Sequence, residues 1–321
     1  MRDHLTLLAA GLILEAAFGY PAPLYRRIGH PVTWIGALIA ALEHRLNRAT
    51  LAPAWRRALG ALTLALVLLA AVLPALALAG LGHRLFPGIM GDLVLGLAAS
   101  TLFAARSLHQ HVGAVAAALA RGGIAGGRAA VAHIVGRDPE TLDEAGVIRA
   151  AIESLAENFS DAVIAPSFWC VLFGLPGLAL YKAANTADSM IGHRNARFAD
   201  FGFAAARFDD LLNLPAARLA ALLLALAAPG RALAVLRAAL RDARHHRSPN
   251  AGWPEAAMAE ALGLRLAGPR VYGGERVLDA WMGEGRAAAT AQDLAHALAL
   301  YRRALALTLA LVLFFVFIVP G

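Results

Sequence analysis

The chain has 321 residues, of which 59% are hydrophobic and only 16% are charged, and its mean hydropathy is +0.61. Soluble domains carry nearer 25% charged residues, so this composition argues against soluble domains and favours a membrane bundle. The net charge of +7 would suggest nucleic acid in a soluble protein. Here, however, arginines flank apolar runs, which is typical of membrane anchoring, and we expect no nucleic-acid partner. The single Cys170 excludes an intrachain disulfide.

Six apolar segments are candidates for crossing a membrane. In chain order they are residues 5–20, 59–81, 89–105, 162–181, 211–228 and 304–319. The second and the last contain no charged side chain and are long enough to cross a hydrocarbon core of about 30 Å. Segment 162–181 contains Pro166 and a Gly-Leu-Pro-Gly sequence at 174–177. It is therefore predicted either to cross as a broken helix or to re-enter.

Polar stretches separate these segments at residues 21–57, 106–161, 182–210 and 231–303. The first is rich in arginine, which places it in the cytoplasm. The last is long enough to form a small cytoplasmic helical subdomain within a single membrane-embedded domain that covers residues 1–321. The predicted fold class is therefore all-α, a polytopic membrane helical bundle with helical polar loops and a broken or re-entrant central helix.

Three carboxylates, Glu153, Glu157 and Asp161, are spaced i, i+4, i+8 and would line one stripe of a helix. Like charges at this spacing destabilise a bare helix, and a divalent metal would neutralise them. Mg²⁺ takes one or two carboxylates and leaves positions for phosphate oxygens. The stripe therefore predicts a metal site; the alternative is a solvated acidic face paired with arginines.

Lys182 is the only lysine in the chain, and Asn185 and Asp188 follow it three residues apart on one helix face. An ammonium group is a compact point charge that suits phosphate and can titrate when it is buried. We interpret this block as functional. The structural alternative is a lysine that reaches the membrane interface, with Asn and Asp as caps.

A third polar face lies at the start of segment 211–228. It combines Asp209, Asp210 and Asn213 with Arg207 and Arg218 on either side. Polar groups at the edge of a membrane segment are costly and are treated as functional by default. The alternative is an Asp–Arg pair that holds helices together.

Three further patches are weaker. Arg137 precedes Asp138 and Pro139, a sequence typical of a helix start. Ser248 and Asn250 belong to a proline-rich turn before an expected helix at 256–262, which Gly263 ends. They could hold an anion, but on spacing alone capping explains them better. His30 precedes another helix start, where a histidine is usually structural.

These polar clusters contain two kinds of side chain: carboxylates and amides, which suit a metal ion, and Lys and Arg, which suit phosphate. They predict phosphoryl chemistry, or the transfer of a phosphorylated group. The sequence contains no P-loop, no Rossmann glycine pattern and no His-Glu-x-x-His zinc motif.

The order of the motifs resembles one known family, the adenosylcobinamide-phosphate synthases of cobalamin biosynthesis. The matching blocks are His30-Pro-Val, Gly136-Arg-Asp, Glu153-Ser-x-x-Glu-Asn-x-x-Asp161, Asn185-Thr-x-Asp-Ser, Phe201-Gly, Ala206-Arg-x-Asp-Asp-x-x-Asn213-x-Pro-Ala-Ala-Arg218 and Ser248-Pro-Asn-Ala-Gly-Trp-Pro-Glu-Ala-Ala257. The resemblance runs from about Gly19 to Gly285. One departure is Tyr20, where the family pattern has Asp in a Gly-Asp-Pro element.

The resemblance implies a multi-pass enzyme of the inner (cell) membrane with its active site facing the cytoplasm. It would be a ligase that joins adenosylcobyric acid to (R)-1-amino-2-propanol O-phosphate, or to free aminopropanol, through an amide bond driven by ATP and Mg²⁺. The corrin propionate would be activated, most simply as an acyl phosphate, and then attacked by the amine. An association with other enzymes of the corrinoid pathway is compatible with this role.

On this basis each residue receives a hypothetical role. Glu153, Glu157 and Asp161 are candidate metal ligands for Mg²⁺–ATP. Lys182, Asp188, Asp209 and Asp210 are candidate catalytic residues that contact phosphate, hold a second metal or orient the amine. Candidate substrate-binding residues are His30, Arg137, Asn185, Arg207, Asn213, Ser248 and Asn250.

Two other functions stay open at this point. An intramembrane Mg²⁺-dependent prenyltransferase also uses Asp and Asn clusters, but only one such cluster, Asp209 to Asn213, is present. A non-enzymatic membrane sensor or transport-like relative would be expected to lack the carboxylates. Topology adds a constraint, because simple alternation of all six segments places the 106–161 and 182–210 motifs on opposite sides. A single active site therefore requires a broken or re-entrant segment 162–181, or a site at membrane depth.

Overall fold

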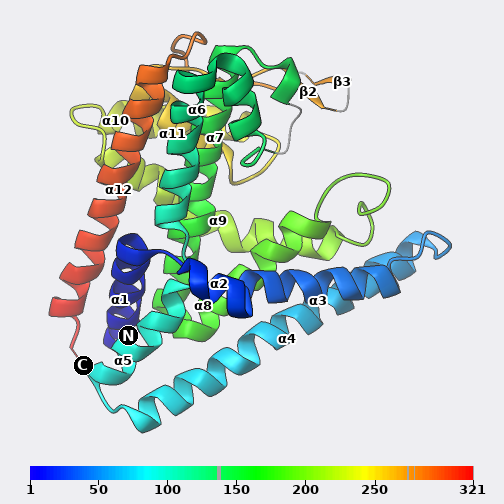
Figure 1. Cartoon of the computed structure of the whole chain (residues 1–321), viewed down its shortest axis with the longest axis vertical. Helices are drawn as coiled ribbons and strands as arrows, with labels where there is room; N and C mark the ends of the chain where they lie inside the picture. The colour runs from blue at the N-terminus through cyan, green and yellow to red at the C-terminus, as the bar shows by residue number, and fades with distance from the viewer. Residues whose placement is uncertain (136–138, 273–274, 278, 321) are drawn as a thin grey trace. The chain divides into compact units, whose positions relative to one another are not determined.

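The computed structural model describes residues 1–135, 139–272, 275–277 and 279–320. These residues are mostly helical, with four short strands (Figure 1). Their contacts divide the chain into two compact units. The first unit comprises Met1–Ala104, Ala165–Asn213 and Leu311–Gly321, and the second comprises Ala105–Ile164 and Leu214–Ala310.

The first unit is a helical assembly whose core is formed by small and branched apolar side chains. Its elements are α1 (Arg2–Phe18), α2 (Ala22–Ile28), α3 (Pro31–Leu46), α4 (Pro53–Leu85), α5 (Ile89–Ser100), α8 (Ala165–Ile191) and the first part of α9 (Phe203–Leu226). Helix α1 packs against α5 and α8, and α4 packs along α8 and α3. Ala183 and Ala187 of α8 are buried together with Ile39, Val67 and Phe201. Their small side chains let the neighbouring helices approach α8 closely.

The second unit combines helices with two small sheets. Its elements are α6 (Ala105–Val131), the 3₁₀ helix η1 (Pro139–Thr141), α7 (Glu144–Phe159), the π-helix η2 (Ser160–Ile164), the rest of α9, α10 (Ala232–Asp242), the 3₁₀ helix η3 (Ala243–His245), α11 (Gly252–Leu262), β1 (Leu266–Ala267), β2 (Arg270–Tyr272), β3 (Glu275–Val277), β4 (Trp281–Met282) and most of α12 (Ala291–Ile318). Strand β1 pairs antiparallel with β4, and β2 pairs antiparallel with β3. Helix α7 packs against α6 and α11.

Four helical stretches in the described part of the chain are long and apolar enough to cross a membrane: Pro53–Leu85, Ile89–Val131, Glu144–Ile191 and Ala291–Ile318. A fifth span is formed if the N-terminal pair, Arg2–Phe18 and Ala22–Leu46, is counted as one element bent by 104°. These stretches confirm a polytopic membrane bundle. Segment 211–228, which we expected to be a candidate span, is not among them, because its helix α9 also contains Arg207, Asp209, Asp210 and Arg218.

Helix α8 is interrupted where the sequence predicted a break. Gly174 has φ 62° and ψ −149°, and Pro176 follows it within the same helix. Residues other than glycine rarely adopt this backbone conformation, and proline has no N–H to donate to the helical hydrogen bonds. The broken central helix is thus confirmed, and its break lies at the Gly-Leu-Pro-Gly sequence.

The stretch 231–303 contains the predicted helix but also strands that we did not expect. Helix α11 begins at Gly252, four residues earlier than predicted, and it ends at Gly263, which has φ 65°. The strands β1 to β4 have only two or three residues each. Alternating hydrophobicity cannot be recognised over so few positions, which explains why the sequence predicted only helices here.

Candidate functional site

A buried hydrogen-bond chain joins α8 to α9 in the first unit. Asn185 donates from Nδ2 to Asp209 Oδ1 over 3.3 Å, and Asn213 donates from Nδ2 to Asp209 Oδ2 over 2.9 Å. Tyr181 in turn donates its hydroxyl to Asn213 Oδ1 over 2.9 Å. Asp209 is 7% exposed and Asn213 is 2% exposed. Both oxygens of one buried carboxylate are therefore held by amides, and Tyr181 fixes the orientation of the Asn213 amide.

Asp209 is the electrostatic centre of this cluster. Burial raises the pKa of Asp209 to about 7, and the neighbouring carboxylate of Asp188 adds to the rise, while the amides of Asn185 and Asn213 oppose it. Burial also raises the pKa of Asp210, although the guanidinium groups of Arg207 and Arg194 lower it. A carboxylate with a pKa near neutrality can take up or release a proton under physiological conditions, which is a property expected of a general base.

Cationic side chains lie around the same cluster. Arg207 Nη1 lies 3.4 Å from Asp210 Oδ2, and the guanidinium of Arg207 also stacks over the Phe203 ring. Lys182 is half-buried, one turn before Asn185 on α8, and is close enough to His30 for an electrostatic interaction. His30 is the N-cap of α3, where its Nδ1 accepts a hydrogen bond of 3.2 Å from the Val32 N–H. This capping role is the structural alternative that the sequence suggested for His30.

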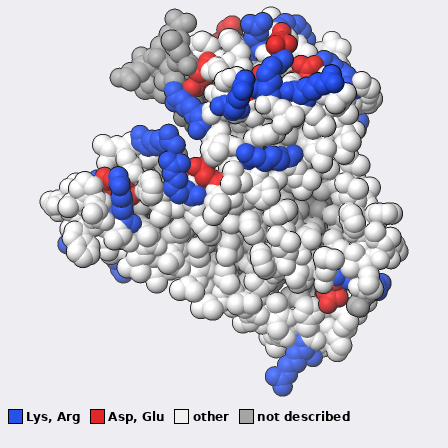
Figure 2. All heavy atoms as spheres, turned by 180° about the vertical axis from the view of Figure 1, so that it is seen from behind, with Lys and Arg blue, Asp and Glu red and all other residues white. Residues whose placement is uncertain are grey.

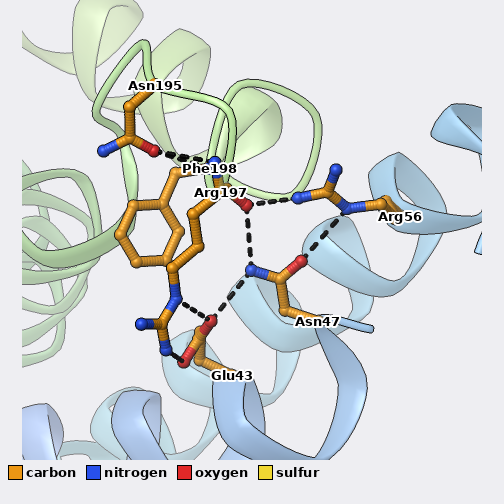
Figure 3. Close-up of polar contacts among 6 residues, drawn as sticks. All are labelled: Glu43, Asn47, Arg56, Asn195, Arg197 and Phe198. Carbon is orange, nitrogen blue, oxygen red and sulfur yellow. Dashed lines mark hydrogen bonds and ion pairs between the residues drawn. The ribbon is translucent and has the colours of Figure 1, made fainter. Parts of the chain in front are cut away.

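The loop between α8 and α9 is clamped to the α3–α4 hairpin (Figure 3). Arg197 binds Glu43 through two hydrogen bonds, of 3.0 and 2.7 Å. Asn47 donates to Glu43 Oε1 over 2.8 Å and to the Arg197 carbonyl over 3.0 Å, and Arg56 donates to Asn47 Oδ1 over 3.1 Å. Asn195 closes the turn by accepting the N–H groups of Arg197 and Phe198, each over 3.0 Å. The chain that connects Asp188 to Asp209 is thereby fixed at its middle.

Close backbone packing holds the end of the same loop. A side chain at Gly60 of α4 would place its Cβ 1.8 Å from the Phe201 carbonyl oxygen, so only glycine fits there. Phe201 itself is fully buried. Further along, Trp169 of α8 donates its Nε1–H to the carbonyl of Leu212 on α9 over 3.1 Å. These contacts set the register in which α8 and α9 present their polar faces to each other.

The three predicted metal ligands lie in the second unit and differ in environment. Glu153 is 5% exposed, and its Oε1 accepts a hydrogen bond of 2.9 Å from the Ala267 N–H on β1. Glu157 is exposed, and Asp161 is half-buried within the π-helix η2. A π-turn is wider than an α-turn and is frequent at functional sites.

A separate cluster in the second unit surrounds Arg218. Its Nη1 donates to Asn250 Oδ1 over 3.0 Å, and its guanidinium lies 4.7 Å from the centroid of the Trp253 ring. Burial lowers the pKa of Arg218. Ser248 Oγ accepts the N–H groups of Asn250 and Ala251, over 3.2 and 3.3 Å. Ser248 thus caps the turn before α11, and Asn250 is oriented by Arg218.

The structure brings the predicted residues together in part. Asn185, Asp188, Asp209, Asp210 and Asn213 form one cluster in the first unit, with Arg207 attached to Asp210. Ser248 and Asn250 form another in the second unit. Arg137 lies outside the described residues. Among the described residues, no group of three or more His, Cys, Asp or Glu could hold a metal ion, so the metal role of Glu153, Glu157 and Asp161 stays a prediction.

Sequence reasoning gave no role to two features that position the cluster. Tyr181 stands four residues before Asn185 and next to Lys182, so its place on the polar face of α8 could have been deduced from helical spacing. The Glu43–Arg197 clamp joins residues 154 positions apart. No local sequence pattern predicts a pairing between residues so far apart. The i, i+4 spacing of Glu43 and Asn47 indicates only a polar helix end.

Comparison with known proteins gives a consistent result. The family described as CobD/Cbib protein matches residues 8–301. A cobalamin biosynthesis protein CobD from Rhodobacter capsulatus is 51% identical over 302 residues, covering 94% of this chain and 93% of the relative. Proteins of the same name from Rhizobium meliloti and Brucella suis are 49% and 48% identical, covering 93% and 98% of this chain and 93% and 97% of the relatives.

No solved structure matches the chain. The family match covers most of the sequence, and each of these relatives is about half identical to it over nearly its whole length. The chain therefore belongs to the CobD/CbiB family of cobalamin biosynthesis, the adenosylcobinamide-phosphate synthases, which are amide-forming ligases.

Proposed function

We propose that the α8–α9 cluster of the first unit carries the amide-forming step between adenosylcobyric acid and (R)-1-amino-2-propanol O-phosphate or free aminopropanol. The observation that supports this most directly is Asp209, a buried carboxylate with a pKa of about 7 that two amides hold in place. An alkyl amine resembles the lysine side chain and is protonated in neutral water. It must lose a proton before its nitrogen can attack the activated corrin carbonyl, and Asp209 would accept that proton.

Neighbouring side chains would orient the amino alcohol. Asn185 and Asn213 fix Asp209, and the half-buried Asp188 adds negative charge beside it. Two like charges in one site attract a cationic amine, so Asp188 and Asp210 would place the ammonium group near Asp209 before the proton moves. Lys182 and Arg207 would contact phosphate groups, because an ammonium and a guanidinium are the usual partners of phosphate oxygens.

Mg²⁺ and ATP are implied by the type of reaction, and the donors present fit them. Mg²⁺ binds through one or two carboxylates and completes its shell with water and phosphate oxygens. Glu157 and Asp161 would meet this requirement in the second unit. In the first unit Asp188 and Asp210 would be the carboxylates for Mg²⁺ only as the alternative to orienting the amine. Glu153 is better suited to holding β1 through Ala267 than to entering a metal shell. When bound, Mg²⁺–ATP would supply the phosphoryl group that activates the corrin carboxylate.

The Ser248–Asn250 turn of the second unit is proposed as a contact for the amides of the corrin periphery. Arg218 orients the Asn250 side chain by binding its oxygen. The arginine-rich stretch at residues 21–57 would face the cytoplasm under the positive-inside rule. The substrates would therefore enter from the cytoplasmic side.

A direct assay tests the proposal. Membranes that contain the full chain are incubated with adenosylcobyric acid, aminopropanol phosphate, ATP and Mg²⁺, and adenosylcobinamide phosphate is measured. Removing a general base lowers rates by about 100-fold or more, so Asp209→Asn should lower the rate by that amount. The matched control is Asp200→Asn in the same unit, where an ion pair with a largely exposed Arg57 is lost. Equal rates for Asp209→Asn and the native chain would overturn the proposed role of Asp209.

Two further substitutions separate the other roles. Lys182→Arg keeps the charge but changes its geometry, and we expect a raised KM for a phosphorylated substrate. Glu157→Gln should shift the Mg²⁺ dependence of the rate; full activity at every Mg²⁺ concentration would exclude Glu157 as a ligand. Formation of adenosylcobinamide phosphate in any of these assays also excludes the two alternative functions, an intramembrane prenyltransferase and a non-enzymatic sensor, because neither forms an amide bond.

A further inference from the structure

The second unit contains a small polar pocket that the proposed function does not use. It has a volume of about 190 Å³ and lies between the loop after α9, the end of α11 and one face of α12. Its polar lining is cationic and comprises Arg231, His296 and Arg303. Drug-sized ligands generally need pockets of about 300 Å³ or more, so this one suits a single small group.

One face of α12 supplies most of the polar wall. His296, Leu300 and Arg303 are spaced i, i+4, i+7, which places them above one another on the helix. Arg303 is followed by the uncharged run 304–319, in which α12 is apolar enough to cross a membrane. The pocket therefore lies at the level where the helix leaves the polar region, as expected for the interface of a bilayer.

The opposite wall carries a balanced ion pair, so the net positive charge of the pocket comes from α12. Arg231 Nη2 lies 2.7 Å from Glu260 Oε1 on α11, so one carboxylate offsets one guanidinium. On α12, Arg303 contributes a full positive charge and His296 contributes imidazole nitrogens to the lining. Arg231 is also the N-cap of α10, and in the described part of the chain no side chain caps that helix end. The first-turn N–H groups of α10 add to the positive potential there.

We propose that this pocket binds the phosphate group of an anionic ligand, with Arg303 and His296 as its main contacts and Arg231 as a secondary one. A guanidinium fork and an imidazole N–H match the several oxygens of a phosphate, and the bound group would sit beside the membrane surface. Two sources share this chemistry: a soluble phosphate and the headgroup of an anionic phospholipid. Figure 2 shows that blue side chains, which here are arginines, are dense over the part of the surface that carries α10 and α11, and this favours the approach of either anion.

The test uses the full chain in nanodiscs and two probes. In the first arm, inorganic phosphate is titrated at constant ionic strength into phosphatidylcholine nanodiscs, and the thermal unfolding midpoint is followed. In the second arm, retention of phosphatidylglycerol over phosphatidylcholine is measured by native mass spectrometry. The double variant H296N/R303Q is compared with Arg302→Gln, which removes one charge from the adjacent position outside the pocket lining.

We expect the double variant to bind at least one probe about tenfold more weakly than the native chain, and Arg302→Gln to match the native chain. A loss confined to the first arm identifies a soluble phosphate, and a loss confined to the second identifies a lipid headgroup. Arg303→Lys keeps the charge without the guanidinium fork, so its binding of the probe should lie between that of the native chain and that of the double variant. This milder substitution keeps the proposal testable if the double variant misfolds. Equal binding by the double variant and Arg302→Gln in both arms would overturn the proposal.

Discussion

Tyr181 donates its hydroxyl to the side-chain oxygen of Asn213 over 2.9 Å, across 32 residues of chain. This bond decides which end of the Asn213 amide faces Asp209, because the oxygen is occupied and only the N–H groups remain for the carboxylate. Helix α8 therefore contacts this pair of α9 side chains twice, since Asn185 of α8 also donates to the other oxygen of Asp209. Consequences for pH dependence, catalysis and stability can each be measured.

The raised pKa of Asp209 predicts a pH-dependent stability. The ordinary pKa of an Asp is 3.8, and in the folded chain that of Asp209 is about 7, so between these values the folded state keeps a proton that the unfolded state releases. The stabilising contribution is present below the unfolded value and is lost as the pH rises through about 7. Asp209→Asn cannot titrate. The difference in thermal unfolding midpoint, variant minus native, should therefore increase between about pH 5 and about pH 8.

The same ionisation should appear in the kinetics of the native enzyme. If Asp209 acts as the base, kcat/KM for the amino alcohol rises with pH through about 7 as the carboxylate forms. A pH profile over that range checks this, with the amine's own ionisation determined separately. A profile that is flat through neutrality would contradict the base role while leaving the stability prediction intact.

Tyr181→Phe should reduce kcat more than it changes KM. The substitution leaves Asn213 Oδ1 buried without its donor, which costs about 1–3 kcal/mol of unfolding free energy, and it frees the amide to rotate away from Asp209. We expect kcat to fall about tenfold. The control is Tyr301→Phe in the second unit, where a buried hydroxyl donates to the Ala105 carbonyl over 2.8 Å. That variant should lose comparable stability with little change in kcat.

Arg218→Lys tests the orientation of Asn250. The guanidinium both binds Asn250 Oδ1 and stacks on Trp253, and an ammonium group cannot reproduce the planar stacking. We expect a loss of about 1 kcal/mol in unfolding free energy and a higher KM for adenosylcobyric acid. Denaturation together with substrate titration measures both. Arg237→Lys on the exposed face of α10 provides the matched control and should change neither quantity.

Glu43→Gln should loosen the loop at 192–202. It removes the charge partner of Arg197 and abolishes one of the two paired hydrogen bonds, because an amide NH2 group cannot accept, while the amide of Asn47 keeps an acceptor. Limited proteolysis within the loop should become faster, and activity should fall through the less defined placement of α9. Arg57→Gln, which breaks the more exposed ion pair with Asp200 in the same loop, should have a smaller effect. If the two variants behaved alike, the clamp would have no special role.

The sequence by itself determined the class of fold and the family, and through the family the type of reaction. Apolar runs of sufficient length specify membrane helices, and the Gly-Leu-Pro-Gly sequence specifies the break in α8, because both depend on local backbone and solvation energetics. Helical spacing also placed Asn185 with Asp188, and Asp209 with Asn213, on their own helix faces. The order of these motifs was enough to recognise the family.

Only the tertiary structure decided which polar faces meet. Asp209 gains the amide donor of Asn185 because α8 and α9 are held in register by contacts between distant residues: Glu43 with Arg197, and Gly60 beside Phe201. The stripe of Glu153, Glu157 and Asp161 instead separates into a buried, an exposed and a half-buried side chain. Glu153 is the one that the strand β1 contacts, through the Ala267 N–H. Spacing along one helix is a local property, whereas burial, pKa and hydrogen-bond partners depend on the segments that pack against it.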